Sequence, residues 1–61
     1  MYRIYGKLNS RSRFQALDAQ NGTFAGNLIY ASMWESREAV TKDCKELTDN
    51  NPHMKFEVRK I

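Results

Sequence analysis

The sequence predicts a small α+β domain in which one helix packs on one face of a mainly antiparallel four-stranded sheet. Three observations support this fold class. Residues 2–8 alternate apolar and charged side chains, residues 54–61 do the same, and residues 36–51 between them have helical spacing. The predicted order is β-β-β-α-β. A chain of 61 residues has room for one domain, which we assign to residues 1–61.

The first and last strands each have one apolar face and one charged face. Residues 2–8 carry Tyr2, Ile4 and Leu8 on the first face and Arg3, Tyr5 and Lys7 on the second. Residues 54–61 carry Phe56 and Val58 on the first face and Lys55, Glu57, Arg59 and Ile61 on the second. We expect the last strand to lie beside the first and parallel to it, because a helix that spans the sheet after a three-strand meander reverses the chain once more.

Two further strands are predicted between these ends. One covers about residues 13–19, and Asn21-Gly22 then predicts a two-residue type I′ turn, which needs positive φ at both central positions. The main body of the third strand is residues 28–34. It has Ile29, Ala31 and Met33 on one face and Leu28, Tyr30 and Trp34 on the other. Apolar residues on both faces are typical of a central or doubly covered strand.

The helix has clear start and stop signals. Ser36 is a candidate N-cap, and Asn50-Asn51-Pro52 ends the helix because proline cannot continue it. Val40, Cys44 and Leu47 fall at i, i+4 and i+7 and so share one stripe. We expect this stripe to cover a core made of Tyr2, Ile4, Leu8, Phe14, Ile29, Ala31, Met33, Phe56 and Val58.

Charge is unevenly distributed along the chain. The net charge is +3, with four basic residues and one acidic residue in residues 1–31 and three basic and one acidic in residues 52–61. Residues 32–51 instead hold three basic and five acidic residues. The predicted strands are therefore basic and the predicted helix acidic. This polarity favours a polyanion or an acidic protein surface on the sheet side, although ordinary solvated faces give the same pattern.

One helix leaves the second face of the sheet uncovered, and that face carries the candidate partner-binding residues. They are Arg3, Tyr5, Lys7, Leu28, Tyr30, Trp34, Lys55 and Arg59. Tyr, Trp and Arg are enriched in protein interfaces, so one interpretation is binding to a protein partner or to a second copy of this chain. A homodimer would also add buried apolar area that so short a chain lacks. The alternatives are a single-stranded nucleic-acid-binding module, in which rings stack on bases and cations contact phosphates, and a purely structural role.

Side chains that often carry chemistry are isolated here. Cys44 is on the inner helical stripe and His53 follows Pro52, so we expect a buried thiol and a loop residue. Asp43, Glu46 and Asp49 are three apart, which is typical of a solvated helix face. We therefore expect no enzyme activity, no cofactor, no metal site and no small-molecule substrate. We also expect no membrane association and a cytoplasmic location, because no signal peptide or long apolar run is present.

Several segments together resemble a known group of proteins. They are residues 2–5, 13–18, 27–31, 51–52 and 55–61. With these segments the chain resembles short proteins encoded by phages, prophages and other mobile elements of gut bacteria. The resemblance implies binding to a host protein in a bacterial cytoplasm, including defence components such as CRISPR effectors. Many such inhibitors are acidic mimics of nucleic acid. The basic sheet departs from that type, which favours direct occlusion of a protein or guide-RNA surface.

Overall fold

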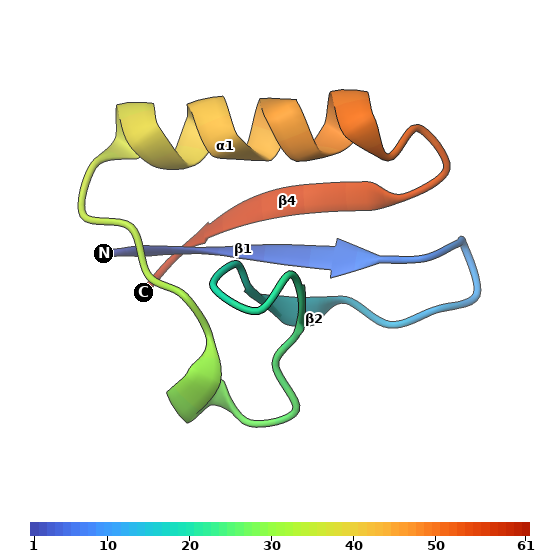
Figure 1. The fold of residues 1–61 in the computed structure, drawn as a ribbon, viewed down its shortest axis with the longest axis horizontal. Coiled ribbons are helices and arrows are strands. Elements are labelled where there is room, and N and C mark those ends of the chain that lie inside the picture. Colours follow the sequence, from blue (N-terminus) through green and yellow to red (C-terminus); the bar gives the residue numbers. More distant parts are fainter.

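The structure, a computed structural model that describes residues 1–61, is one sheet with one α-helix on one of its faces (Figure 1). The strands are β1 (Tyr2–Lys7), β2 (Gln15–Asp18), β3 (Thr23–Phe24) and β4 (Lys55–Lys60), and the helix is α1 (Arg37–Asn50). Neighbouring strands are antiparallel throughout, in the order β3-β2-β1-β4. The predicted α+β class, with its antiparallel four-stranded sheet, is confirmed.

The longest ladder joins the two ends of the chain. β1 and β4 pair from Tyr2↔Lys60 to Lys7↔Lys55. The predicted place of the last strand beside the first is correct, but its predicted parallel direction is wrong. The reason is the route before the helix. Residues 25–36 return to the start of β1, so α1 runs in the same direction as β1 and β4 runs back against it (Figure 1).

The predicted third strand over residues 28–34 does not form. β3 has two residues, and residues 28–30 form a 3₁₀-helical turn. Asn27 is the N-cap of this turn, since its Oδ1 accepts a hydrogen bond from the Ile29 N–H at 3.2 Å. Such local side-chain contacts offer the backbone an alternative to a sheet ladder. The apolar residues of this segment therefore do not extend the sheet.

The end of the same segment is tied to two strands. The Ser32 N–H donates to the Leu17 carbonyl at 2.9 Å, and Ser32 Oγ accepts from the Ala19 N–H at 2.9 Å. Trp34 and Tyr2 then exchange two backbone hydrogen bonds of 2.8 and 2.9 Å in an isolated bridge. These bonds place Trp34 beside the first residue of β1, immediately before α1 begins.

The turn between β2 and β3 also differs from the prediction. It has four residues, 19–22, and Gly22 is the one residue with positive φ, at +66°. A type I′ turn needs positive φ at two positions, so the predicted turn type is wrong. The Asp18 carboxylate stabilises the turn by accepting from the Asn21 N–H at 3.2 Å and the Asn21 side-chain amide at 2.8 Å. Asp18 is buried, and these bonds compensate its loss of hydration.

The core lies between α1 and the sheet. Ile4 and Val40 are fully buried, and Leu17 completes the central cluster. The apolar side chains packed around it are Tyr2, Phe24, Trp34, Cys44, Leu47 and Phe56. Neither α1 nor the short turn at 28–30 has the length and apolarity that crossing a bilayer requires.

Some residues predicted for the core lie elsewhere. Leu8, Ile29 and Met33 are exposed, by 58%, 76% and 54%. Phe14 contacts Lys7 on the far side of the sheet, and Leu17 faces α1 in its place. Phe14 and Leu17 are three residues apart, so in an extended chain they point to opposite faces and only one of them can join the core.

The predicted helix start is correct, and it gives a stability prediction. Ser36 Oγ accepts a hydrogen bond from the Ala39 N–H at 3.3 Å. Replacing Ser36 by alanine leaves that N–H without its cap, so we expect the free energy of unfolding to fall by about 1 kcal/mol in urea titrations. Ser10 is exposed in a turn and serves as the matched control, with no expected change. Equal losses in both variants would contradict the capping role.

Candidate binding surface

The sheet face turned away from α1 carries a group of basic residues on β1 and β4. Ile4 and Val58 face the helix side and are directly opposite each other, so the residues that alternate with them face the other way. We call this surface the basic face. It consists of Arg3, Tyr5, Lys7, Lys55, Glu57 and Arg59. Five of the eight candidate binding residues are therefore brought together as the sequence predicted, on two neighbouring strands.

Two like-charged pairs lie directly across the β1–β4 ladder on this face. Arg3 is opposite Arg59, and Lys7 is opposite Lys55. Like charges placed directly opposite destabilise an antiparallel pair. One acid, Glu57, lies between them and accepts a hydrogen bond from Arg59 Nε at 2.6 Å. The basic face therefore keeps an excess of positive charge at some cost to its own ladder.

Two of these cations contact aromatic rings on the same side of the sheet. The Arg59 guanidinium lies 4.1 Å from the centroid of the Tyr5 ring, and Lys7 Nζ lies 4.8 Å from that of Phe14. Cation–π contacts at this distance are attractive and hold the side chains near the sheet. Arg3 has a buried Nε that makes no hydrogen bond within the chain. The rings on this face are thus already in contact with cations from the chain itself.

Three of the predicted face residues do not lie on the basic face. Leu28 and Tyr30 belong to the 3₁₀-helical turn and are 52% and 65% exposed there. Trp34 points to the helix side, where its indole Nε1–H donates to Asp43 Oδ2 at 2.7 Å. All three lie elsewhere for one reason: residues 28–34 do not form the strand on which a shared face was predicted for them.

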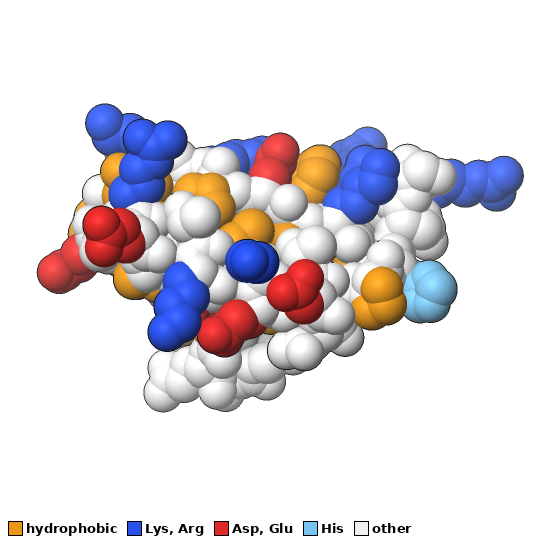
Figure 2. Space-filling view, turned by 90° about the horizontal axis from the view of Figure 1, so that it is seen from above, with side chains coloured by type: hydrophobic (Ala, Val, Ile, Leu, Met, Phe, Trp, Pro, Cys, Tyr) orange, Lys and Arg blue, Asp and Glu red, His pale blue; other side chains and the backbone are white.

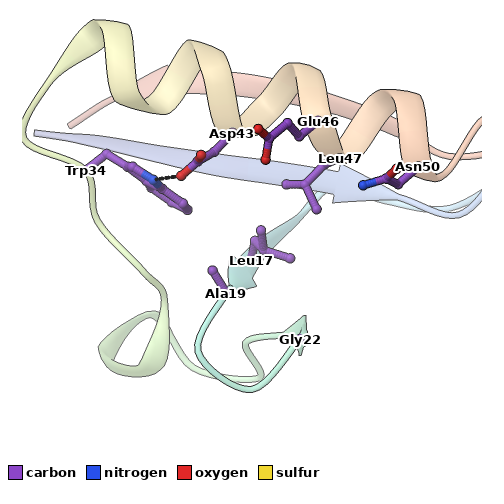
Figure 3. Close-up of a pocket in the computed structure, with 8 residues that line it drawn as sticks. All are labelled: Leu17, Ala19, Gly22, Trp34, Asp43, Glu46, Leu47 and Asn50. Carbon is purple, nitrogen blue, oxygen red and sulfur yellow. Dashed lines mark hydrogen bonds between the residues drawn. The ribbon is translucent and has the colours of Figure 1, made fainter.

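Trp34 instead lines a groove between α1 and β2, which the sequence did not predict (Figure 3). Its remaining walls are Leu17, Ala19, Gly22, Asp43, Glu46, Leu47 and Asn50. The one usable signal was on the helix, where Asp43, Glu46 and Asn50 recur at i, i+3 and i+7 and so share a flank. The residues opposite that flank are set by the course of residues 25–34. Local sequence patterns did not predict that course.

The single cysteine lies beside the core. Cys44 is a free, partly buried thiol of the central cluster, and burial raises the pKa of that thiol. A raised pKa lowers the thiolate fraction at neutral pH, and the thiolate is the nucleophilic form. No group of three or more His, Cys, Asp or Glu side chains is placed to hold a metal ion.

Viewed from the helix side, the surface is also unevenly charged. In Figure 2, Lys and Arg side chains predominate along the upper margin of the molecule, with an acidic side chain among them. Comparison of the chain with protein-family models, with curated proteins and with solved structures gives no match.

Proposed function

We propose that this chain is a small non-catalytic binding protein whose basic face binds an acidic surface of a partner protein. The observation that carries the proposal is the β1–β4 face turned away from α1, on which four cations accompany a single acid. Two like-charged pairs directly across the ladder weaken the isolated fold. The carboxylates of an anionic partner would lie among these cations on binding. Their attraction to the cations would offset the repulsion between the cations.

The rings on the basic face favour a protein over a nucleic acid. Base stacking needs free ring faces, but the rings of Tyr5 and Phe14 are already contacted by Arg59 and Lys7. Binding of two copies through their basic faces is opposed by the like charge of those faces. A partner protein with Asp and Glu residues fits both observations.

The resemblance to small proteins of phages and mobile elements supplies a context for this proposal. In that context the partner is a bacterial host protein, including components of defence systems, and binding blocks one of its surfaces. The basic charge of the face supports occlusion of an acidic protein surface in preference to mimicry of nucleic acid.

Reversal of one charge on the basic face tests the proposal. Lys55→Glu places a carboxylate opposite Lys7, so it should weaken partner binding while the free energy of unfolding stays the same or rises. Wild type and variant would be used as baits for affinity capture from a bacterial lysate, and the captured proteins titrated against both. We expect the acidic partner to bind Lys55→Glu at least about tenfold more weakly than wild type.

Lys45→Glu is the matched control, because Lys45 is exposed on α1 and the change in net charge is the same. It should bind like wild type. A partner that binds all three proteins equally would exclude the basic face. A single-stranded oligonucleotide titrated at rising salt separates the alternative, since phosphate contacts give a steep loss of affinity with salt. Oligonucleotide binding that is lost in Lys55→Glu and kept in Lys45→Glu would show that the basic face binds nucleic acid and not a protein.

A further inference from the structure

The groove beside Trp34 lies on the opposite side of the sheet from the basic face and has a different chemistry. It encloses about 260 Å³ between α1 and β2, with Leu17, Trp34 and Leu47 as its large apolar walls. A second hollow of about 210 Å³ adjoins it and shares Leu17 and Leu47. Each is smaller than the roughly 300–1,000 Å³ typical of small-molecule pockets, a size that suits individual side chains of a peptide.

The groove follows from the layer geometry of the fold. Four strands spaced about 4.8 Å apart give a sheet about 14 Å wide, whereas a helix with its side chains is about 10 Å across. α1 packs mainly over β4 and β1, at one side of the sheet. The helix side of β2 and β3 is therefore left without a helix above it. Figure 3 shows this space, with Leu47 pointing into it from α1 and Leu17 from β2.

The helix flank above the groove is acidic. Asp43 and Glu46 both line it from α1, and the ion pair within the chain, between Arg59 and Glu57, involves neither. Asp43 accepts the Trp34 indole N–H, which fixes the ring as one wall. Asn50 adds an amide at the far end. No basic side chain lines the first hollow or the adjoining one, so the acidic rim has no counter-charge there.

We propose that this groove binds a peptide segment that inserts one or two large apolar side chains beside Trp34 and places a Lys or Arg against Glu46 and Asp43. The apolar walls supply the area that large side chains bury, and the uncompensated acids select the charge of the flanking residue. The site is independent of the basic face, which attracts the opposite charge. A small chain would thereby hold two partners, or two parts of one partner, on opposite sides of its sheet.

Selection from a displayed library of random 12-residue peptides on the immobilised full chain tests the inference. We expect enriched peptides to share one or two large apolar residues next to Lys or Arg. One selected peptide would then be titrated while the emission of Trp34, the single tryptophan, is followed. Binding should shift that emission, and replacing the basic residue of the peptide by Glu should weaken binding at least about tenfold.

Two variants on the same helix locate the site. Glu46→Lys should weaken the selected peptide at least about tenfold, because it places a cation against the cation of the peptide. Asp49→Lys makes the same change in charge at an exposed position that does not line the groove, and it should bind like wild type. Equal binding by both variants, no enrichment, or enrichment of peptides without a basic residue would overturn the proposal.

The same experiment separates the two surfaces. Enriched acidic peptides that lose affinity in Lys55→Glu would support the basic face and overturn the groove. Loss of peptide affinity in Glu46→Lys, with no loss in Lys55→Glu, supports the groove even if the basic face proves to bind nothing. Sedimentation velocity of the chain alone measures self-association. A dimer that is lost in Glu46→Lys would mean that the groove binds a second copy of the chain and not a foreign peptide.

Discussion

Replacing Ile4 by alanine is expected to remove about 2–5 kcal/mol from the free energy of unfolding. Ile4 is fully buried on β1 and packs in the central cluster with Val40 and Leu17. The change deletes apolar contacts and leaves a cavity at the point where α1 meets the sheet. A domain of this size has a stability of roughly 3–9 kcal/mol, so the loss takes a large part of the total.

Urea unfolding followed by far-ultraviolet circular dichroism measures this effect. Ile4→Val is the matched control, because it removes one methyl group and should cost only about 0.5–1.5 kcal/mol. Val58 on the neighbouring strand is 37% exposed, and Val58→Ala should cost less than Ile4→Ala. Similar losses in Ile4→Ala and Val58→Ala would show that the core does not centre on Ile4.

A side chain at Gly6 is expected to destabilise the fold by about 1–3 kcal/mol, even one as small as alanine. Gly6 lies directly opposite Phe56 across the β1–β4 ladder. A Cβ at this position would lie 2.8 and 2.9 Å from two ring atoms of Phe56 and 3.0 Å from one of Phe24. Both rings pack against the core, so neither moves away without loss of contacts elsewhere.

The same denaturation assay gives the test, with a second glycine as control. A Cβ added at Gly26 would meet no atom within 4 Å, and Gly26 has no positive φ, so Gly26→Ala should be neutral or slightly stabilising. Phe56→Leu should relieve part of the overlap. The double variant Gly6→Ala/Phe56→Leu is therefore expected to lose less stability than the sum of the two single losses. A strictly additive result would mean that the Phe56 ring does not set the limit at Gly6.

The two proposed surfaces follow from a single property of the fold, which is that one helix cannot cover a four-stranded sheet. The basic face lies where no helix packs, on the far side of β1 and β4. The groove lies where the helix side extends past α1, over β2. Their charges are opposite, since Lys55 and its neighbours are basic and Asp43 and Glu46 are acidic. Selective loss of binding in Lys55→Glu or in Glu46→Lys distinguishes them.

Alternation along the two terminal strands was enough to assign the faces of β1 and β4. A strand has a side-chain period of two, so Arg3, Tyr5 and Lys7 had to share one face wherever the strand lay. The helix could be predicted equally well, because a Ser36 cap and a break at Pro52 are local signals. These patterns predicted the fold class and most of the basic face.

The fate of residues 28–34 was settled by tertiary structure. Their apolar side chains fit either a central strand or a returning segment, and periodicity does not separate the two. The backbone hydrogen bonds between Trp34 and Tyr2 join residues far apart in the chain, and they fixed the second choice. That return set the direction of α1, made β4 antiparallel to β1, and opened the groove. Local residue patterns thus decided the two terminal strands, the helix and which side chains share a face of each. Long-range pairing decided the course of residues 25–34, the direction of α1 and β4, and what lies between them.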